Sequence, residues 1–337
     1  MAAPATTRTD RFPVFAWVVL AFTILVIISG DIVQATESGA GCGETWPRCD
    51  GSLIPSISDL QTGIEFTHRM VTAVLGFGYI GVVIGAWRRR GWTDGTGALA
   101  TVGRLLTPAG FADAYRRSSA LWRVTVWAVV FFVVEVILGA MLVVFGWVES
   151  DASIGRVIVD SVHLVNTFAM VLTLTLVVFY ASGGGALRLD RSRLSHKLLL
   201  AGAGIITLIG ITGAINSLAD ALYFAEDVIV EETPIASILV TIRGIHPVVA
   251  IGGGIGVFLI ARYLASGQGE TVRRYALVIQ GIIWAQFVIG FLNIALLTPL
   301  ESQVAHLLTA HVLWVVFVLF GAALIEEPAP VGEAIEA

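Results

Sequence analysis

The sequence predicts an all-α integral membrane protein whose eight transmembrane helices form two tandem, pseudo-symmetric four-helix bundles. Lipid is the expected main solvent, because 56% of the 337 residues are hydrophobic and only 13% are charged. An ordinary soluble domain has about 25% charged residues. Apolar runs of about 20 residues recur along the chain, and each is long enough as a helix to cross a hydrocarbon core roughly 30 Å thick. An internal repeat then divides the runs into two halves.

The expected helices are placed on the apolar runs, and their ends are set to within several residues. In chain order they cover residues 13–30, 65–87, 122–146, 157–180, 197–218, 237–261, 275–297 and 304–325. The first run follows Arg8 and Arg11 and also resembles a signal peptide, with Val33-Gln34-Ala35 as a cleavage site. We favour a transmembrane helix, because the run is long and its removal would leave the two halves unequal.

Basic residues set the expected orientation of the helices. Most of the 20 lysines and arginines fall before the first helix or in the connections that follow the second, fourth and sixth helices. Because Lys and Arg concentrate in cytoplasmic loops, both termini are expected on the cytoplasmic side of the cell membrane. The opposite segments carry acids such as Asp31, Glu44 and Asp50, so the net charge of -5 reflects sidedness and implies no nucleic-acid partner.

An internal repeat divides the chain near residue 190 into an N-terminal bundle, 1–190, and a C-terminal bundle, 191–337. The matching segments are Glu135-Val-Ile-Leu-Gly139 and Gln286-Phe-Val-Ile-Gly290 in the third and seventh helices, and Gly30 with Gly210 and Gly213 in the first and fifth helices. Each half also has a long outer connection between its first and second helices. Duplication is the simplest explanation of this pattern.

Four of the six histidines lie near the outer ends of the second, fourth, sixth and eighth helices, one pair in each half. They are His68, His163, His246 and His306, and a polar residue precedes each by three positions, namely Glu65, Asp160, Arg243 and Gln303. Each of these polar residues is expected one turn further out on nearly the same helix face. A lone intramembrane histidine is often only hydrogen-bonded to a neighbouring helix, but polar groups in a bilayer usually mark sites or cofactors. Two imidazoles facing across a bundle can bind the axial positions of a heme iron, so we expect heme ligation by both pairs.

The other two histidines are weaker candidates. His196 lies beside Arg193 and Lys197 at the expected cytoplasmic boundary, where it would be solvated or face lipid headgroups. His311 lies about 140° around the helix from His306 and cannot share its heme face, so a structural role is expected.

Three charged residues near the expected heme sites are further candidates. Arg69 and Arg243 flank histidines of the two pairs, and either guanidinium would suit a heme propionate. Snorkelling to lipid headgroups is the alternative for both. Glu135 lies near the middle of the third helix, where an acid is a functional candidate, but the matching Gln286 is neutral and the role of Glu135 stays open.

The two cysteines, Cys42 and Cys49, both lie in the first outer loop. An oxidising compartment permits a disulfide between them. A structural staple and a redox-active pair both remain open, whereas two cysteines alone cannot form a four-ligand zinc site.

Taken together, these residues resemble the heme A synthase family, membrane enzymes that convert heme O into heme A for terminal oxidases. The resemblance covers nearly the whole chain. The segments that carry it are Ser38-Gly-Ala-Gly-Cys42-Gly-Glu-Thr-Trp46-Pro47-Arg-Cys49-Asp-Gly51-Ser-Leu-Ile-Pro55, Ile64-Glu65-Phe-Thr-His68-Arg69, Leu138-Gly139-Ala140 and Gln303-Val-Ala-His306. The cysteine loop followed by Glu-x-x-His-Arg is the specific part.

The resemblance implies an oxidoreductase that converts one ring methyl of heme O to an aldehyde by successive hydroxylations with oxygen. The implied roles are substrate-heme ligation by His68 and His163, ligation of a permanent heme b by His246 and His306, catalysis by Glu65 and, for Cys42 and Cys49, the extracytoplasmic cysteine pair of the family. The alternative role for Glu65 is to orient His68. Expected partners are membrane lipids, the heme O synthase that supplies the substrate, the terminal oxidase under assembly and an electron donor such as a quinol.

Two departures from the family and two competing interpretations accompany this assignment. The stretch from Leu218 to Ser237 lacks the second cysteine pair of many members, and Gln34 replaces the usual arginine after the first helix.

A di-heme cytochrome b-type electron carrier would need histidines near both membrane faces. A heme or small-molecule transporter would place its site near the midplane between repeats. The candidate histidines all lie towards one face, which favours the enzyme.

Overall fold

The structure is a computed structural model, and it describes residues 10–57, 59–89, 118–149, 151–224, 238–239 and 241–327. Most of the basic segment between the second and third helices lies outside these residues. So does most of the cysteine-free stretch from Leu218 to Ser237.

Eight long helices make up nearly all of the described chain. They are α1 (Phe12–Ala35), α2 (Leu60–Arg89), α5 (Ala120–Val144), α6 (Ile154–Ala181), α7 (Leu194–Phe224), α9 (Ile245–Leu264), α10 (Glu270–Ala295) and α11 (Leu300–Ile325). Each contains a stretch long and apolar enough to cross a membrane. The only β-structure among the described residues is two isolated bridges. The predicted class, an all-α membrane protein with eight spanning helices, is confirmed.

Short polar side chains cap the first turns of several helices. The hydroxyls of Ser119 and Ser153 accept hydrogen bonds from the backbone N–H groups of Trp122 and Arg156, each at 3.3 Å, and so cap α5 and α6. Asp59 similarly accepts a bond from the Thr62 N–H at 2.7 Å at the start of α2. These side chains satisfy N–H groups that have no partner within the helix.

The sixth predicted helix begins later than expected. It was placed from residue 237, and residues 238–239 and 241–242 are helical, but a turn that contains Arg243 and Gly244 interrupts the span and α9 begins at Ile245. Pro247 explains the difference, because a proline ring clashes with the carbonyl four residues earlier and is tolerated only in the first turn of a helix. Arg243 therefore lies in the turn just before the helix that carries His246, and its predicted position one turn further out stays a prediction.

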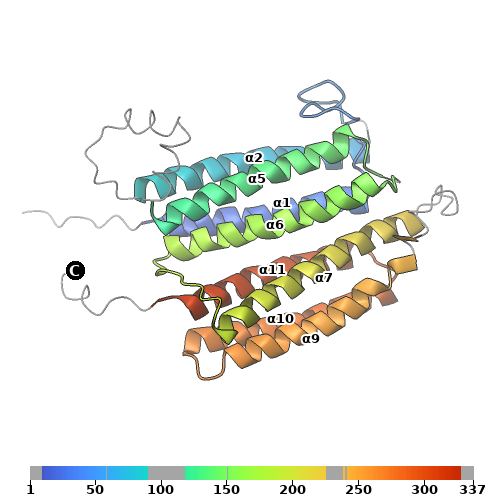
Figure 1. Ribbon diagram of the computed structural model, residues 1–337. Helices are drawn as coiled ribbons and strands as arrows, with labels where there is room; N and C mark the ends of the chain where they lie inside the picture. The colour runs from blue at the N-terminus through green and yellow to red at the C-terminus, as the bar shows by residue number, and fades with distance from the viewer. Residues whose placement is uncertain are drawn as a thin grey trace, which may run out of the picture.

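The helices form two groups that pack side by side. Figure 1 shows α1, α2, α5 and α6 along one half of the molecule and α7, α9, α10 and α11 along the other. The groups meet where α1 and α6 pack against α11, and α6 also packs against α7. Phe168 of α6 fills this seam: its carbonyl accepts a 2.8 Å hydrogen bond from the Trp314 indole, and its ring occupies the space beside Gly210. The tandem duplication itself stays a prediction.

The two ends of the molecule differ in character. The start of α1 and the end of α11 lie at one end, and the cysteine loop between α1 and α2 lies at the other (Figure 1). At the first end, the linker between α6 and α7 is held by the last residue of α11 and the segment that follows it. Arg188 donates its N–H to Ile325 at 3.0 Å, and Glu327 donates its N–H to Ala186 at 2.8 Å.

His196, in the first turn of α7, contacts this linker and corrects a prediction. It was expected to be solvated or to face headgroups, but it is only 6% exposed, and its Nδ1 accepts a 2.7 Å hydrogen bond from the Asp190 backbone N–H. The bend of the linker brings that N–H to the Nδ1 atom of the ring. The imidazole therefore serves as the hydrogen-bond acceptor for the Asp190 backbone N–H.

Candidate functional site

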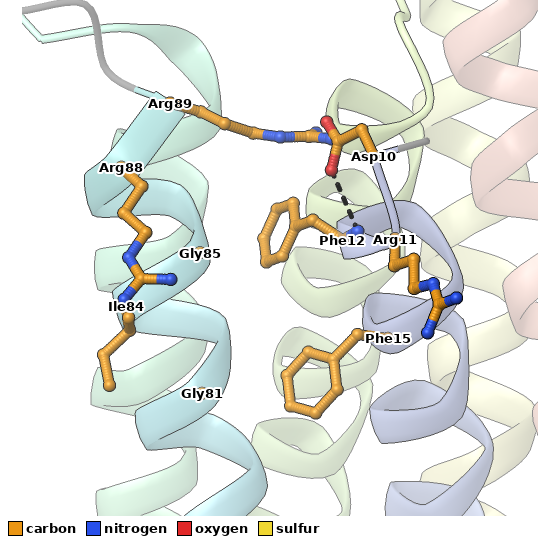
Figure 2. Close-up of a pocket in the computed structure, with 9 residues that line it drawn as sticks. All are labelled: Asp10, Arg11, Phe12, Phe15, Gly81, Ile84, Gly85, Arg88 and Arg89. Carbon is orange, nitrogen blue, oxygen red and sulfur yellow. Dashed lines mark hydrogen bonds and ion pairs between the residues drawn. The ribbon is translucent and has the colours of Figure 1, made fainter. Parts of the chain in front are cut away.

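The four predicted histidines all lie within the first three turns of helices that begin at the cysteine-loop end. His68 is in α2, His163 in α6, His246 in α9 and His306 in α11. The cleft between α1 and α2 in Figure 2 lies elsewhere: it is lined by Gly81, Gly85 and Arg89, and Arg89 forms an ion pair with Asp10. Gly81 lies 13 residues after His68 on the same helix, or about 20 Å along it. That cleft is therefore not part of the histidine site.

Each histidine ring stands against a glycine on the preceding helix. A Cβ added to Gly30 would lie 3.1 Å from His68, and one added to Gly213 would lie 3.2 Å from His246. The corresponding distances are 3.5 Å from Gly139 to Nε2 of His163 and 3.4 Å from Gly290 to His306. Packing thus explains why glycine occupies the matched positions of the sequence repeat: the missing side chain leaves room for an imidazole between two helices.

Polar side chains on the preceding helices fix three of the four rings through Nδ1. Ser29 contacts Nδ1 of His68 at 2.7 Å, and Thr212 contacts Nδ1 of His246 at 3.2 Å. An oxygen of Glu135 lies 3.1 Å from Nδ1 of His163. A metal-binding histidine usually has its other ring nitrogen held in this way, which leaves Nε2 for the metal.

Sequence reasoning missed Ser29 and Thr212, although the repeat contained a signal for them. A hydroxyl residue precedes the matched glycine in both halves, as Ser29-Gly30 and Thr212-Gly213. The pattern becomes meaningful only when the helix pairs are docked, because the hydroxyl of one helix then reaches the ring on the next.

The C-terminal pair fits a heme iron between two imidazoles. The ring centres of His246 and His306 are 6.4 Å apart and their planes are nearly perpendicular, at 88°. Bonds from a metal to imidazole nitrogen are about 2 Å long, so a single iron has room between the rings. His68 and His163 in turn lie near enough to interact electrostatically.

Two histidines suffice for the axial positions of a heme iron, because the porphyrin supplies four nitrogen ligands. Within the described part of the chain, no group of three or more His, Cys, Asp or Glu side chains is arranged to hold a metal ion.

Glu65 joins the histidine site to the cysteine loop. Its side chain is almost completely buried, and Oε2 accepts a 2.6 Å hydrogen bond from the Cys42 backbone N–H. Oε1 accepts from Nε of Arg69 at 3.1 Å and also forms an ion pair with Nη2. The alternative role considered for Glu65 was to orient His68. In the structure Ser29 contacts Nδ1 of that ring.

The cysteine loop is closed by the expected disulfide and is tied to α2. Cys42 and Cys49 are bonded to each other. Nη1 of Arg69 donates to the carbonyls of Thr45 and Arg48, each at 2.8 Å. Most of the Arg69 guanidinium is thus used by Glu65 and the loop. A propionate contact by Arg69 stays a prediction, and so does one by Arg243, which interacts electrostatically with Asp220.

His311 is placed as expected for a structural residue. It is fully buried at the seam between the halves, its Nδ1 contacts the Leu307 carbonyl at 2.9 Å, and its ring packs near Phe168. Its position away from the facing pair agrees with the predicted angle to His306.

Comparison with known sequences identifies the family. A model described as cytochrome oxidase assembly protein matches residues 13–63 and 58–318. The chain belongs to this family. Among cytochrome oxidase assembly proteins, relatives named heme A synthase match parts of the chain, which confirms the resemblance found in the sequence. One from Bacillus licheniformis is 32% identical over 158 residues, 47% of this chain and 42% of the relative. One from Shouchella clausii is 47% identical over 66 residues, 20% of this chain and 22% of the relative.

A longer alignment is made with a differently named protein. A Thermus thermophilus protein named protoheme IX farnesyltransferase is 34% identical over 331 residues, which cover 96% of this chain and 50% of the relative. The chain therefore spans about half the length of this curated relative.

Proposed function

We infer that the protein is a heme A synthase, an oxidoreductase that oxidises one methyl group of heme O to a formyl group. The observation that carries the proposal is the set of four histidines, each beside a glycine at the same end of the bundle and arranged in two pairs. Membership of the cytochrome oxidase assembly protein family and similarity to proteins named heme A synthase support it. The product, heme A, would serve a terminal oxidase under assembly.

The C-terminal half, 191–337, would hold the permanent cofactor. His246 and His306 would bind heme b through their Nε2 atoms, with Thr212 fixing the ring of His246. A heme iron with two histidine ligands transfers single electrons. The role of this half is therefore to pass electrons from a donor, for which a quinol is the proposed class, towards the other half.

The N-terminal half, 1–190, would hold the substrate. His68 and His163 would bind the iron of heme O, and Ser29 and Glu135 hold the opposite sides of the two rings. Glu65 is the proposed catalytic residue, because its buried carboxylate lies one turn from His68 and is kept in place by Arg69 and the Cys42 N–H. Such a group can stabilise positive charge or exchange a proton at a reacting carbon beside it.

The proposed location is the cell membrane, with both termini in the cytoplasm and both heme sites towards the extracytoplasmic side. Basic residues at the end where α1 begins and α11 finishes support this orientation. The disulfide at the opposite end supports it too, because disulfides persist in oxidising compartments. Membrane lipids and the heme O synthase are the proposed partners, together with the oxidase.

The deciding experiment supplies purified protein with heme O, oxygen and a reductant, and separates the extracted hemes by chromatography. Formation of heme A, through a hydroxylated intermediate, is expected. Bound heme that undergoes reversible reduction without any change in the heme O would instead identify an electron carrier. Protein that binds no heme in any preparation would contradict both.

The name of the Thermus relative gives a second candidate activity, farnesyl transfer to protoheme. A parallel reaction with protoheme and farnesyl diphosphate tests it. We expect no farnesylated product, because the four-histidine arrangement suits redox chemistry at iron and offers nothing that transfer of an isoprenoid chain requires.

A further inference from the structure

Glu135 is held from three sides beside one of the proposed heme ligands. Its Oε1 lies 3.1 Å from Nδ1 of His163 and also accepts a hydrogen bond from the Thr167 hydroxyl. Its Oε2 accepts a 2.6 Å bond from Asn166, whose amide also donates to the Phe131 carbonyl at 2.8 Å. Both oxygens of this intramembrane carboxylate are therefore engaged, and its position beside the imidazole is fixed.

The matching position in the other half carries a neutral amide. Gln286 precedes Gly290 by four residues, as Glu135 precedes Gly139. Its Nε2 donates to the His306 backbone carbonyl at 3.0 Å, which places the amide beside the second ligand of that half. The Oε1 of Gln286 and the Nδ1 of His306 are both buried without a hydrogen-bond partner among the described residues. The imidazole of His163 thus has a carboxylate at its Nδ1, whereas the matching amide of Gln286 bonds the backbone carbonyl of His306 and its ring Nδ1 has no described partner.

We propose that Glu135 is a positioning residue that acts through His163 to lower the reduction potential of the iron in the N-terminal half. The difference between Glu135 and Gln286 then gives the two otherwise similar sites different potentials. This inference rests on the proposed ligation of heme by the four histidines.

The physical reason is the effect of a hydrogen-bonded carboxylate on an imidazole. A carboxylate that accepts the Nδ1 proton makes the opposite nitrogen more basic. A more basic axial ligand stabilises the oxidised iron more than the reduced iron, which lowers the potential. A neutral amide has a much weaker effect, because it carries no charge.

The charged and neutral side chains are divided between the two proposed roles. The carboxylate is found in the half proposed to oxidise the substrate. The half proposed only to transfer electrons has the amide.

The test exchanges the two side chains and measures reduction potentials of the bound hemes by spectroelectrochemical titration. The two transitions are first assigned with His163→Ala and His306→Ala proteins, each of which should lose one of them. Glu135→Gln should shift the reduction equilibrium of the N-terminal heme at least about tenfold towards the reduced form, or about 59 mV upwards for one electron. Gln286→Glu should shift the C-terminal heme in the opposite direction.

Matched variants separate this effect from a general change of charge or packing. Asn293→Asp also places a carboxylate on α10, but two turns from Gln286, so it should leave the potential near its original value. Glu135→Asp keeps the charge and should preserve most of the low potential. If Glu135→Gln protein loses its N-terminal heme, the Gln286→Glu measurement decides alone.

Unchanged potentials in both exchanged proteins would overturn the inference. So would an equal downward shift in Asn293→Asp and Gln286→Glu. The titration reports on bound heme whatever product is made, so a failure to form heme A would refute the proposed function without affecting this result. Protein that binds no heme would overturn both.

Discussion

Glu65 accepts a 2.6 Å hydrogen bond from the backbone N–H of Cys42, so the carboxylate one turn before His68 is attached directly to the disulfide loop. This contact combines two roles that the sequence presented separately. Glu65 both holds the loop against α2 and offers a buried charge at the proposed substrate site. Substitution of Glu65 must therefore be tested for chemistry and for local structure at the same time.

Glu65→Gln should abolish heme A formation, with at least about a tenfold loss, while bound heme is retained. Glutamine can still accept the Cys42 N–H but cannot supply the negative charge proposed to act at the reacting carbon. Extraction and chromatography of the hemes measure the loss, and the absorption spectrum measures the heme content. A normal yield of heme A would refute the catalytic role, and loss of all bound heme would make Glu65 a structural residue.

Gly213→Val should weaken heme binding in the C-terminal half. A Cβ at this position already lies 3.2 Å from His246, and the branched side chain would push the imidazole from its place. The readout is the low-spin heme spectrum of the purified protein. Gly204→Val is the matched control on the same helix, because a Cβ at Gly204 meets nothing within 4 Å. Equal spectra for the two variants would contradict the importance of this glycine.

His246→Ala and His306→Ala should each remove the same low-spin heme b signal, because the two rings face each other across one site. His311→Ala is the control: its ring is buried on a different side of α11 and should affect stability rather than the spectrum. The assignment fails if the signal survives in both single variants or disappears equally in the control.

The Cys42–Cys49 disulfide should be present in the native protein and protected by Arg69. Mass spectrometry of the unreduced peptide should show the loss of two hydrogens relative to the dithiol. Arg69→Gln removes the bonds to the carbonyls of Thr45 and Arg48, so mild reductant should open the disulfide several-fold faster. Arg48→Gln, which changes a charge in the same loop but keeps its backbone carbonyl, should not. Thiols that alkylate freely without reductant would contradict the disulfide.

The fold class and the histidine pairs were accessible from the sequence. Apolar runs of membrane-spanning length, an approximate repeat and four histidines at matched positions are local or periodic features, and the hydrocarbon core imposes helix length regardless of how helices pack. The start of α9 was placed wrongly because apolar composition continues before Ile245, whereas the break there depends on the backbone clash of Pro247.

The partners of the site residues were decided only by tertiary structure. The sequence contained Ser29, Glu135 and Thr212, but the spacing along one helix does not specify which group on the next helix an atom will meet. The register and close approach of two helices at each glycine determine that Ser29 reaches His68 and that Glu135 reaches His163. His196 was misplaced for the same reason, because its partner, the Asp190 N–H, comes from the bend of a linker. The apolar runs determined which residues enter the membrane, and the packing of helices determined which polar atoms meet there.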